Sequence, residues 1–175
     1  DRPNVFAATI GILDSEDINF LDAKFFGVQN GLCFDCLKIS DGNGKALSKK
    51  GEKIKKIRNR LTKLLDEENL IPKLVQKRLP KNLKHFNLKT SISVKHDMTN
   101  RWTQLDLRTK DRPGILANVS KVFVEHGAVI KKARIATYGE RAEDRFCISS
   151  KEDTPFIKKE ELNRLIADLE KSLKI

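Results

Sequence analysis

The segment best suited to chemistry is Asp-Arg-Pro-Gly at residues 111–114, which stands directly before an apolar helical pattern. The first N–H groups of a helix have no partners within the helix and create a positive potential, so they suit a ligand's carboxylate. Gly114 lets a ligand approach the backbone closely, and Pro113 suits the first position of a helix. Asp111 is suited either to cap the helix or to face an ammonium group, and Arg112 to pair with a carboxylate. A capped helix that binds no ligand is the alternative.

Asp-Arg-Pro also occurs at residues 1–3, again ahead of an apolar helical pattern, with Asn4 in place of the glycine. Further along the chain, after one extra residue in a turn of the first copy, Asp35 aligns with Asp144 and Leu37 with Phe146. Such agreement of turn signals and apolar positions indicates two copies of one small module.

The second copy predicts a full set of elements. Residues 103–109 alternate between apolar and polar, which indicates a strand, and apolar residues at helical spacing then continue to Gly127, a typical helix stop. Residues 128–138 and 142–149 predict a hairpin, and a last helix follows. Residues 89–96 are expected to pair with 103–109, which gives the order ββαββα.

The first copy predicts a helix over 5–15, a hairpin of 19–28 with 32–40, and a helix that carries apolar residues from Ile54 to Leu65. A ferredoxin-like module has a central strand before its first helix. We therefore expect the first module to be N-terminally truncated and to leave an unpaired edge at 32–40. The predicted fold class is α+β, with helices on one face of antiparallel sheets. The expected organisation is a first module over 1–69, a basic linker with a short helix over 70–88, and a second module over 89–175.

The net charge of +11 is concentrated between Lys45 and His96, where 16 Lys and Arg residues face 4 Asp and Glu residues. This segment suits a nucleic acid or an acidic protein surface, but it is also typical of a solvated helix face, and it lacks interleaved aromatic residues for base stacking. No apolar run approaches the roughly 18 residues of a membrane span. Cys33 and Cys36 have the spacing of a metal motif. On a strand, however, residues three apart face opposite sides, so we expect small buried residues and no metal site.

The order of these motifs resembles a known family. The segments "DRPGILANVSKVF" and "ARIATYGERAEDRFCI" are similar to an ACT domain, a small-molecule-sensing module. Over nearly the whole chain, the sequence resembles the C-terminal tandem ACT region of the PII uridylyltransferase/uridylyl-removing family. The segments that carry this narrower resemblance are "GERAED", "LPKNLKHFNLKTSISV" and "LDAKFFGVQNGLCFDCLKISDGNG".

The resemblance implies a regulatory region that senses L-glutamine within a longer cytoplasmic enzyme of nitrogen regulation. Other domains of that enzyme add UMP to the PII signalling protein and remove it, and they are expected to use Mg²⁺ or Mn²⁺. In this chain we expect no catalytic residue, cofactor or metal, because the single His96-Asp97 pair falls in a predicted turn without further ligands. The expected partners are glutamine, PII through the parent enzyme, the catalytic domains through residues 45–95, and a second ACT module within the chain or in a dimer. We expect no membrane and no nucleic-acid partner.

In ACT domains the ligand site combines this loop of one module with the start of a strand in the neighbouring module. Carried over to this sequence, the resemblance implies a glutamine site made by the residues Asp111, Arg112, Pro113, Gly114, Ile115, Leu116, Ala117, Asn19 and Asn4.

Three other readings stay open. One is an ACT-type regulatory module of another amino-acid metabolic enzyme. Another is a basic nucleic-acid-binding sandwich, although its middle strands would offer only Phe146 for base stacking. The third is a small acyl-phosphate hydrolase on the same fold, for which residues 111–114 are a poor phosphate cradle.

Overall fold

The computed structural model describes residues 5–27, 33–66 and 88–174. Its elements, in chain order, are α1 (Val5–Ser15), β1 (Ile18–Gly27), β2 (Cys33–Asp41), α2 (Glu52–Asp66), β3 (Ser91–Asp97), β4 (Trp102–Lys110), α3 (Ile115–Glu125), β5 (Val129–Tyr138), β6 (Arg141–Ser149) and α4 (Lys159–Leu173). We call α1 to α2 the first module and β3 to α4 the second module. The predicted order ββαββα of the second module is confirmed. The predicted linker, 70–88, lies almost wholly outside the described residues.

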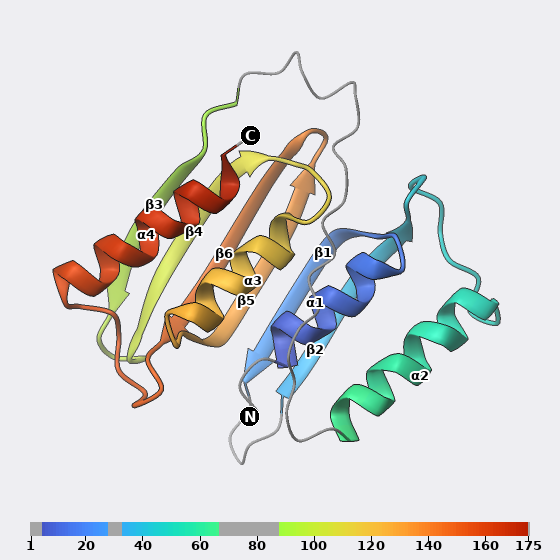
Figure 1. Cartoon of the computed structure of the whole chain (residues 1–175), viewed down its shortest axis with the longest axis horizontal. Coiled ribbons are helices and arrows are strands. Elements are labelled where there is room, and N and C mark those ends of the chain that lie inside the picture. Colours follow the sequence, from blue (N-terminus) through green and yellow to red (C-terminus); the bar gives the residue numbers. More distant parts are fainter. Residues whose placement is uncertain (1–4, 28–32, 67–87, 175) are drawn as a thin grey trace.

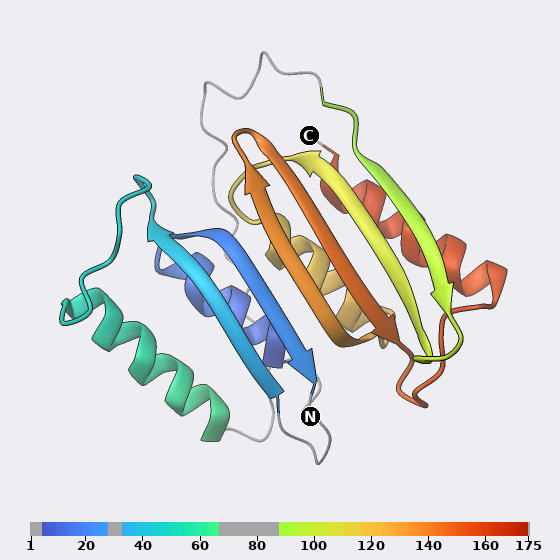
Figure 2. The same cartoon turned by 180° about the vertical axis from the view of Figure 1, so that it is seen from behind.

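The six described strands form one open antiparallel sheet in the order β2-β1-β5-β6-β4-β3. The helices α1, α3 and α4 lie over one face of it, and α2 lies next to α1, beside the outer strand β2 (Figure 1). The view from behind shows the opposite face without helices (Figure 2). The fold is therefore α+β, as predicted. The sequence left open whether the modules pair within one chain or in a dimer. In this chain β1 pairs with β5, for example Asp22 with Ala136, and joins the two modules edge to edge in one sheet. The β1–β2 hairpin and the β5–β6 hairpin each have an edge strand with free backbone N–H and C=O groups. Pairing of β1 with β5 provides hydrogen-bond partners for these groups.

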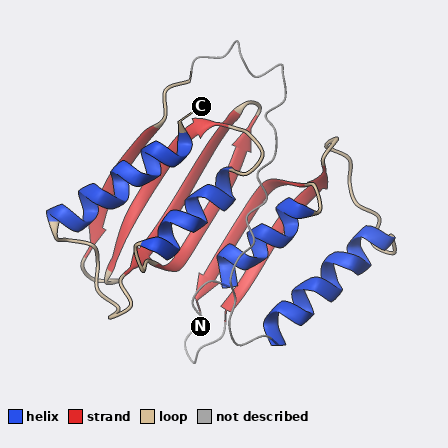
Figure 3. Cartoon of the chain, viewed as in Figure 1, coloured by secondary structure: helices blue, strands red, loops and turns tan. Residues whose placement is uncertain are grey.

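The repeat is visible in three dimensions. The elements α1, β1, β2 and α2 recur as α3, β5, β6 and α4. The antiparallel pairing of β1 with β5 places α1 beside α3 at the centre of the helix layer, with α2 and α4 outside them (Figure 3). This central position explains why α1 is buried from Ala7 to Asp14.

One hydrophobic core runs through both modules, from Ile10 and Phe25 in the first to Leu105 and Leu165 in the second. Aromatic rings connect them. The ring centroid of Phe146 on β6 lies 5.1 Å from that of Phe123 and 6.2 Å from that of Phe6 on α1. Phe6 is in turn 4.6 Å from Phe25, and all three contacts are edge to face, the arrangement that aromatic pairs favour.

The exposed end of the sheet is β2, in agreement with the predicted edge over 32–40. Its inward residues Leu37 and Ile39 are partly exposed, whereas Phe146 of β6, which aligns with Leu37, is 1% exposed. The difference follows from position, because β6 has strands on both sides and β2 has a described strand only at β1. The prediction that Cys36 is buried is wrong. Its thiol is exposed on a strand at the end of the sheet.

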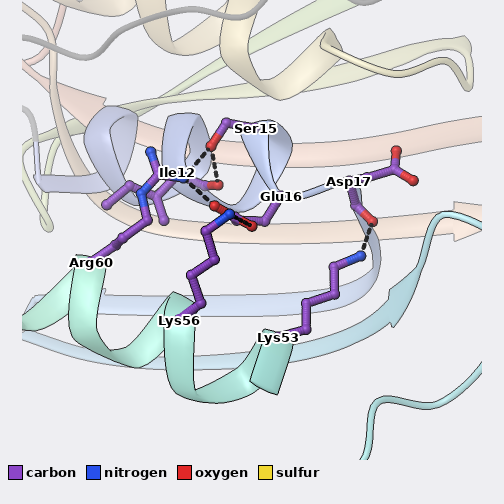
Figure 4. Close-up of polar contacts among 7 residues, drawn as sticks. All are labelled: Ile12, Ser15, Glu16, Asp17, Lys53, Lys56 and Arg60. Atoms are coloured by element: carbon purple, nitrogen blue, oxygen red, sulfur yellow. Dashed lines mark hydrogen bonds and ion pairs between the residues drawn. The ribbon is translucent and has the colours of Figure 1, made fainter. Parts of the chain in front are cut away.

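An ion-pair cluster around the buried carboxylate of Glu16 attaches α2 to the end of α1 (Figure 4). The carboxylate of Glu16, only 8% of whose side chain is exposed, receives Arg60 on Oε1 and Lys56 on Oε2, the latter at 3.0 Å. Lys53 donates to the carbonyl of Asp17 at 3.1 Å. Thus three of the basic side chains of α2, those of Lys53, Lys56 and Arg60, bind to groups of the first module at the end of α1.

Replacing Glu16 with glutamine is expected to lower the free energy of unfolding by about 1–2 kcal/mol at neutral pH. Burial acts to raise the pKa of Glu16, but hydrogen bonds from Lys56 and Arg60 outweigh it and hold this pKa below its ordinary value of 4.5. The stability that the ionised group contributes is therefore present above about pH 4.5 and is lost as the pH falls through the lowered pKa.

Denaturant unfolding at neutral pH and at about pH 3 measures this difference, which should shrink at the lower pH. Glu52→Gln is the matched control, because the Glu52 side chain is 89% exposed and pairs only with Lys55. A loss of equal size at both pH values would show that packing, and not charge, accounts for the role of Glu16.

Candidate ligand-binding site

A cavity of about 270 Å³ lies where the two modules meet. The second module lines it with the whole segment from Asp111 to Ala117, and the first module lines it with Asn19 at the start of β1. The structure therefore brings together eight of the nine residues that the sequence predicted for a site, namely Asp111, Arg112, Pro113, Gly114, Ile115, Leu116, Ala117 and Asn19. The ninth, Asn4, lies outside the described residues.

The loop between β4 and α3 has a defined backbone conformation. The Asp111 N–H donates to the Glu140 carbonyl at 2.7 Å, which ties the loop to the β5–β6 turn. Gly114 is the N-cap of α3 with φ 85° and ψ 0°, a left-handed conformation that favours glycine. A Cβ at this position would meet no atom within 4 Å, so the backbone here borders open space. No side chain caps the helix, and the first i→i−4 bond runs from the Asn118 N–H to the Gly114 carbonyl at 2.9 Å.

Two sequence-based roles at this loop need correction. Pro113 does not occupy the first helical position, because the helix begins at Ile115 and Pro113 precedes the N-cap. Asp111 does not cap the helix. It accepts a hydrogen bond from the Arg112 N–H, and burial raises the pKa of its carboxyl.

Arg112 is directed toward the end of α4. Its Nη2 donates to the carbonyls of Ser172 at 3.4 Å and Lys174 at 3.3 Å, and Asn118 Nδ2 donates to the Ser172 carbonyl at 3.3 Å. Cations and amide donors are favourable at a helix C-terminus, where carbonyls lack partners. Arg112 therefore holds the loop against the end of α4.

The opposite wall belongs to the first module. Asn19 Nδ2 donates to the Asp41 carbonyl at 3.0 Å, which fixes the amide at the junction of β1 and β2. Thr137 of β5 donates from Oγ1 to the Phe20 carbonyl at 3.2 Å and so crosses between the modules beside the cavity. Both walls are held by hydrogen bonds before any ligand arrives.

Sequence reasoning missed two acidic residues that line the cavity, Asp14 of α1 and Asp144 of β6. Asp144 is 3% exposed, and burial raises its pKa from 3.8 to about 7, with a smaller contribution from the charge of Asp111. The alternation along the strand indicated that Asp144 is buried. Asp144 shares one face of β6 with Ala142 and Phe146, and both of these neighbours are apolar. A carboxyl at such a position has to be buried.

The described residues include no group of three or more His, Cys, Asp or Glu side chains that could hold a metal ion. The pair His96-Asp97 lies at the end of β3, where the Asp97 carboxylate accepts hydrogen bonds from Asn100 within the turn. Among the helices of the described ranges, none has the length and apolar character that crossing a membrane requires.

Relatives among known proteins match most of the chain. Over 155 residues, or 89% of the chain, it is 34% identical to the bifunctional uridylyltransferase/uridylyl-removing enzyme of Acinetobacter baumannii (strain ATCC 17978). Over the same length it is 32% identical to the enzyme of that name from Pseudomonas savastanoi pv. phaseolicola and 31% identical to that of Pseudomonas putida. The match spans 17% of the length of each relative. No family model matches the chain, and no solved structure gives a significant match. The chain is thus a homologue of one region of the bifunctional uridylyltransferase/uridylyl-removing enzymes.

Proposed function

We propose that this chain is a regulatory region of such an enzyme, made of two ACT modules that bind L-glutamine in the cavity between them. The observation that carries the proposal is the meeting of Asn19 from one module with the segment Asp111 to Ala117 from the other around one cavity. A ligand in this place contacts both modules at once. Its binding therefore affects how the modules sit against each other, which is what a sensor requires.

The chemistry of the cavity suits a free amino acid. The start of α3 offers backbone N–H groups to a carboxylate. The amide of Asn19 and the hydroxyl of Thr137 are polar groups that an amide side chain such as that of glutamine can reach. A volume of about 270 Å³ is close to the lower end of the range of small-molecule sites. Transfer of UMP to PII and its removal belong, in this proposal, to other parts of the enzyme, with Mg²⁺ or Mn²⁺ as their cofactor.

Titration calorimetry of the chain with L-glutamine tests the proposal. Gly114→Val is expected to weaken binding by about tenfold or more, because the branched side chain enters the open space at the loop and strains a left-handed backbone. Gly114→Asn should weaken binding less through strain, since asparagine tolerates this conformation and stands at the aligned position, Asn4, of the first copy.

Gly127→Val is the matched control. Gly127 also has a positive φ, of 63°, but it lies at the end of α3 away from the cavity. Equal glutamine affinity in wild type and Gly114→Val would remove the loop from the site. Binding of a different amino acid in place of glutamine would identify the chain as a sensor for that amino acid.

A further inference from the structure

A buried carboxyl group that has no cation partner among the described residues borders the cavity. Asp144 is 3% exposed, and its Oδ1 accepts one hydrogen bond, of 3.3 Å, from the Ala136 N–H. Among the described residues, the one charge that acts on it noticeably is the like charge of Asp111. Buried carboxylates are normally paired with a cation, because removing a charge from water costs several kcal/mol. Burial therefore favours the neutral form of Asp144, and a cation bound beside it would stabilise the ionised form.

The other charged groups of the cavity do not supply that cation. Asp14 from α1 and Asp111 from the loop are acidic, and the guanidinium of Arg112 donates to the Ser172 and Lys174 carbonyls at the end of α4. The cavity thus has an acidic part at Asp111 and Asp144 and a part with positive potential at the start of α3. An α-amino acid carries an ammonium group and a carboxylate on the same carbon and matches both parts.

We propose that Asp144, together with Asp111, forms the ammonium subsite of this cavity, in which the α-ammonium group of the ligand is the counter-ion of the Asp144 carboxylate. The ligand's α-carboxylate then lies at the start of α3. This assignment rests on the proposed function and adds to it the residues that select an amino acid over its deaminated analogue.

Binding is then linked to a proton. Below its pKa of about 7 the free Asp144 carboxyl is largely neutral, whereas a bound ammonium group stabilises its ionised form. Glutamine therefore displaces a proton from Asp144 at acidic pH, and its affinity rises with pH until the free carboxyl is ionised. The negative charge of Asp111 also attracts an ammonium group, whereas the positive charge of Arg112 repels it.

Calorimetry with two probes, L-glutamine and glutaramic acid, tests this subsite, because glutaramic acid is glutamine without the α-amino group. Wild type is expected to bind glutamine about tenfold more tightly at about pH 8 than at about pH 6, with proton release detected in buffers of different ionisation enthalpy. Asp144→Asn should bind glutamine about tenfold or more weakly at the higher pH and lose the pH dependence. Glutaramic acid should bind wild type weakly and show little difference between the two proteins.

Glu143→Gln is the control. Glu143 directly precedes Asp144 on β6, but its side chain is on the opposite face of the strand, where it pairs with Arg141 at 3.0 Å. Equal glutamine affinity in wild type and Asp144→Asn, or equal affinity of wild type for the two probes without proton release, would overturn the subsite while leaving the proposed function in place. The two-probe comparison on wild type does not depend on the folding of any variant. Absence of glutamine binding to wild type at both pH values would overturn the proposed function and the subsite with it.

Discussion

Replacing Phe146 with alanine is expected to lower the free energy of unfolding by about 3–5 kcal/mol. The ring is 1% exposed and contacts Phe123 of its own module and Phe6 of the other, with centroids 5.1 Å and 6.2 Å away. Its removal leaves a cavity in the shared core and also removes two edge-to-face contacts, each with a small additional contribution. Such a loss is a large part of the stability of a small protein.

Denaturant unfolding followed by the fluorescence of Trp102, the one tryptophan of the chain, and by circular dichroism measures this effect. Phe34→Ala is the matched control. Phe34 is 63% exposed on β2, so its truncation should change the stability by well under about 1 kcal/mol. Because Phe6 belongs to the first module, the transition in Phe146→Ala should shift for both probes together. A shift of the Trp102 signal alone would contradict a core shared by the modules.

Replacing Asp144 with asparagine is expected to stabilise the ligand-free chain at about pH 8 by up to about 4 kcal/mol, since each pKa unit corresponds to about 1.4 kcal/mol. The pKa of Asp144 rises from 3.8 to about 7 on folding because the carboxyl is buried. The folded chain therefore binds more protons than the unfolded chain between these values, and its stability falls as the pH rises through this window. Asparagine stays neutral and keeps an oxygen for the Ala136 N–H, so it removes this cost.

Thermal unfolding at a series of pH values from about 4 to about 8 measures the prediction. Wild type and variant should be most alike at the acidic end and differ most at the alkaline end. Asp35→Asn serves as the control, because Asp35 occupies the aligned position on β2 and is exposed, and its pKa is raised only by partial burial. Parallel pH profiles of wild type and Asp144→Asn would contradict a raised pKa. A residue that lowers stability when charged is typical of a binding site, where function and stability compete.

The amino-acid sequence by itself determined the local structure. The helix over Val5–Ser15 and the strand pair around residues 99–101 follow from apolar spacing and turn residues, which act over short distances along the chain. The chemistry of a helix entry identified Asp111 to Gly114 as a loop of interest, and the resemblance to ACT domains added Ile115 to Ala117 and Asn19 of the other module. The alternation along β6 also indicates that Asp144 is buried, because Ala142 and Phe146 on the same face are apolar.

Only the tertiary structure decided how the modules join and which groups meet. Pairing of β1 with β5 depends on free edges of two distant hairpins, and no local pattern specifies such a contact. The same pairing brings Asp14 of α1 and Asp144 of β6 to one cavity and leaves Cys36 on an exposed strand at the end of the sheet. Arg112 was assigned to a ligand by its charge, yet it caps α4, because the C-terminal carbonyls of that helix lie within its reach only after folding. Burial and electrostatic pairing depend on the folded arrangement, and for this reason the contacts of Arg112 and the burial of Asp144 were decided by the tertiary structure.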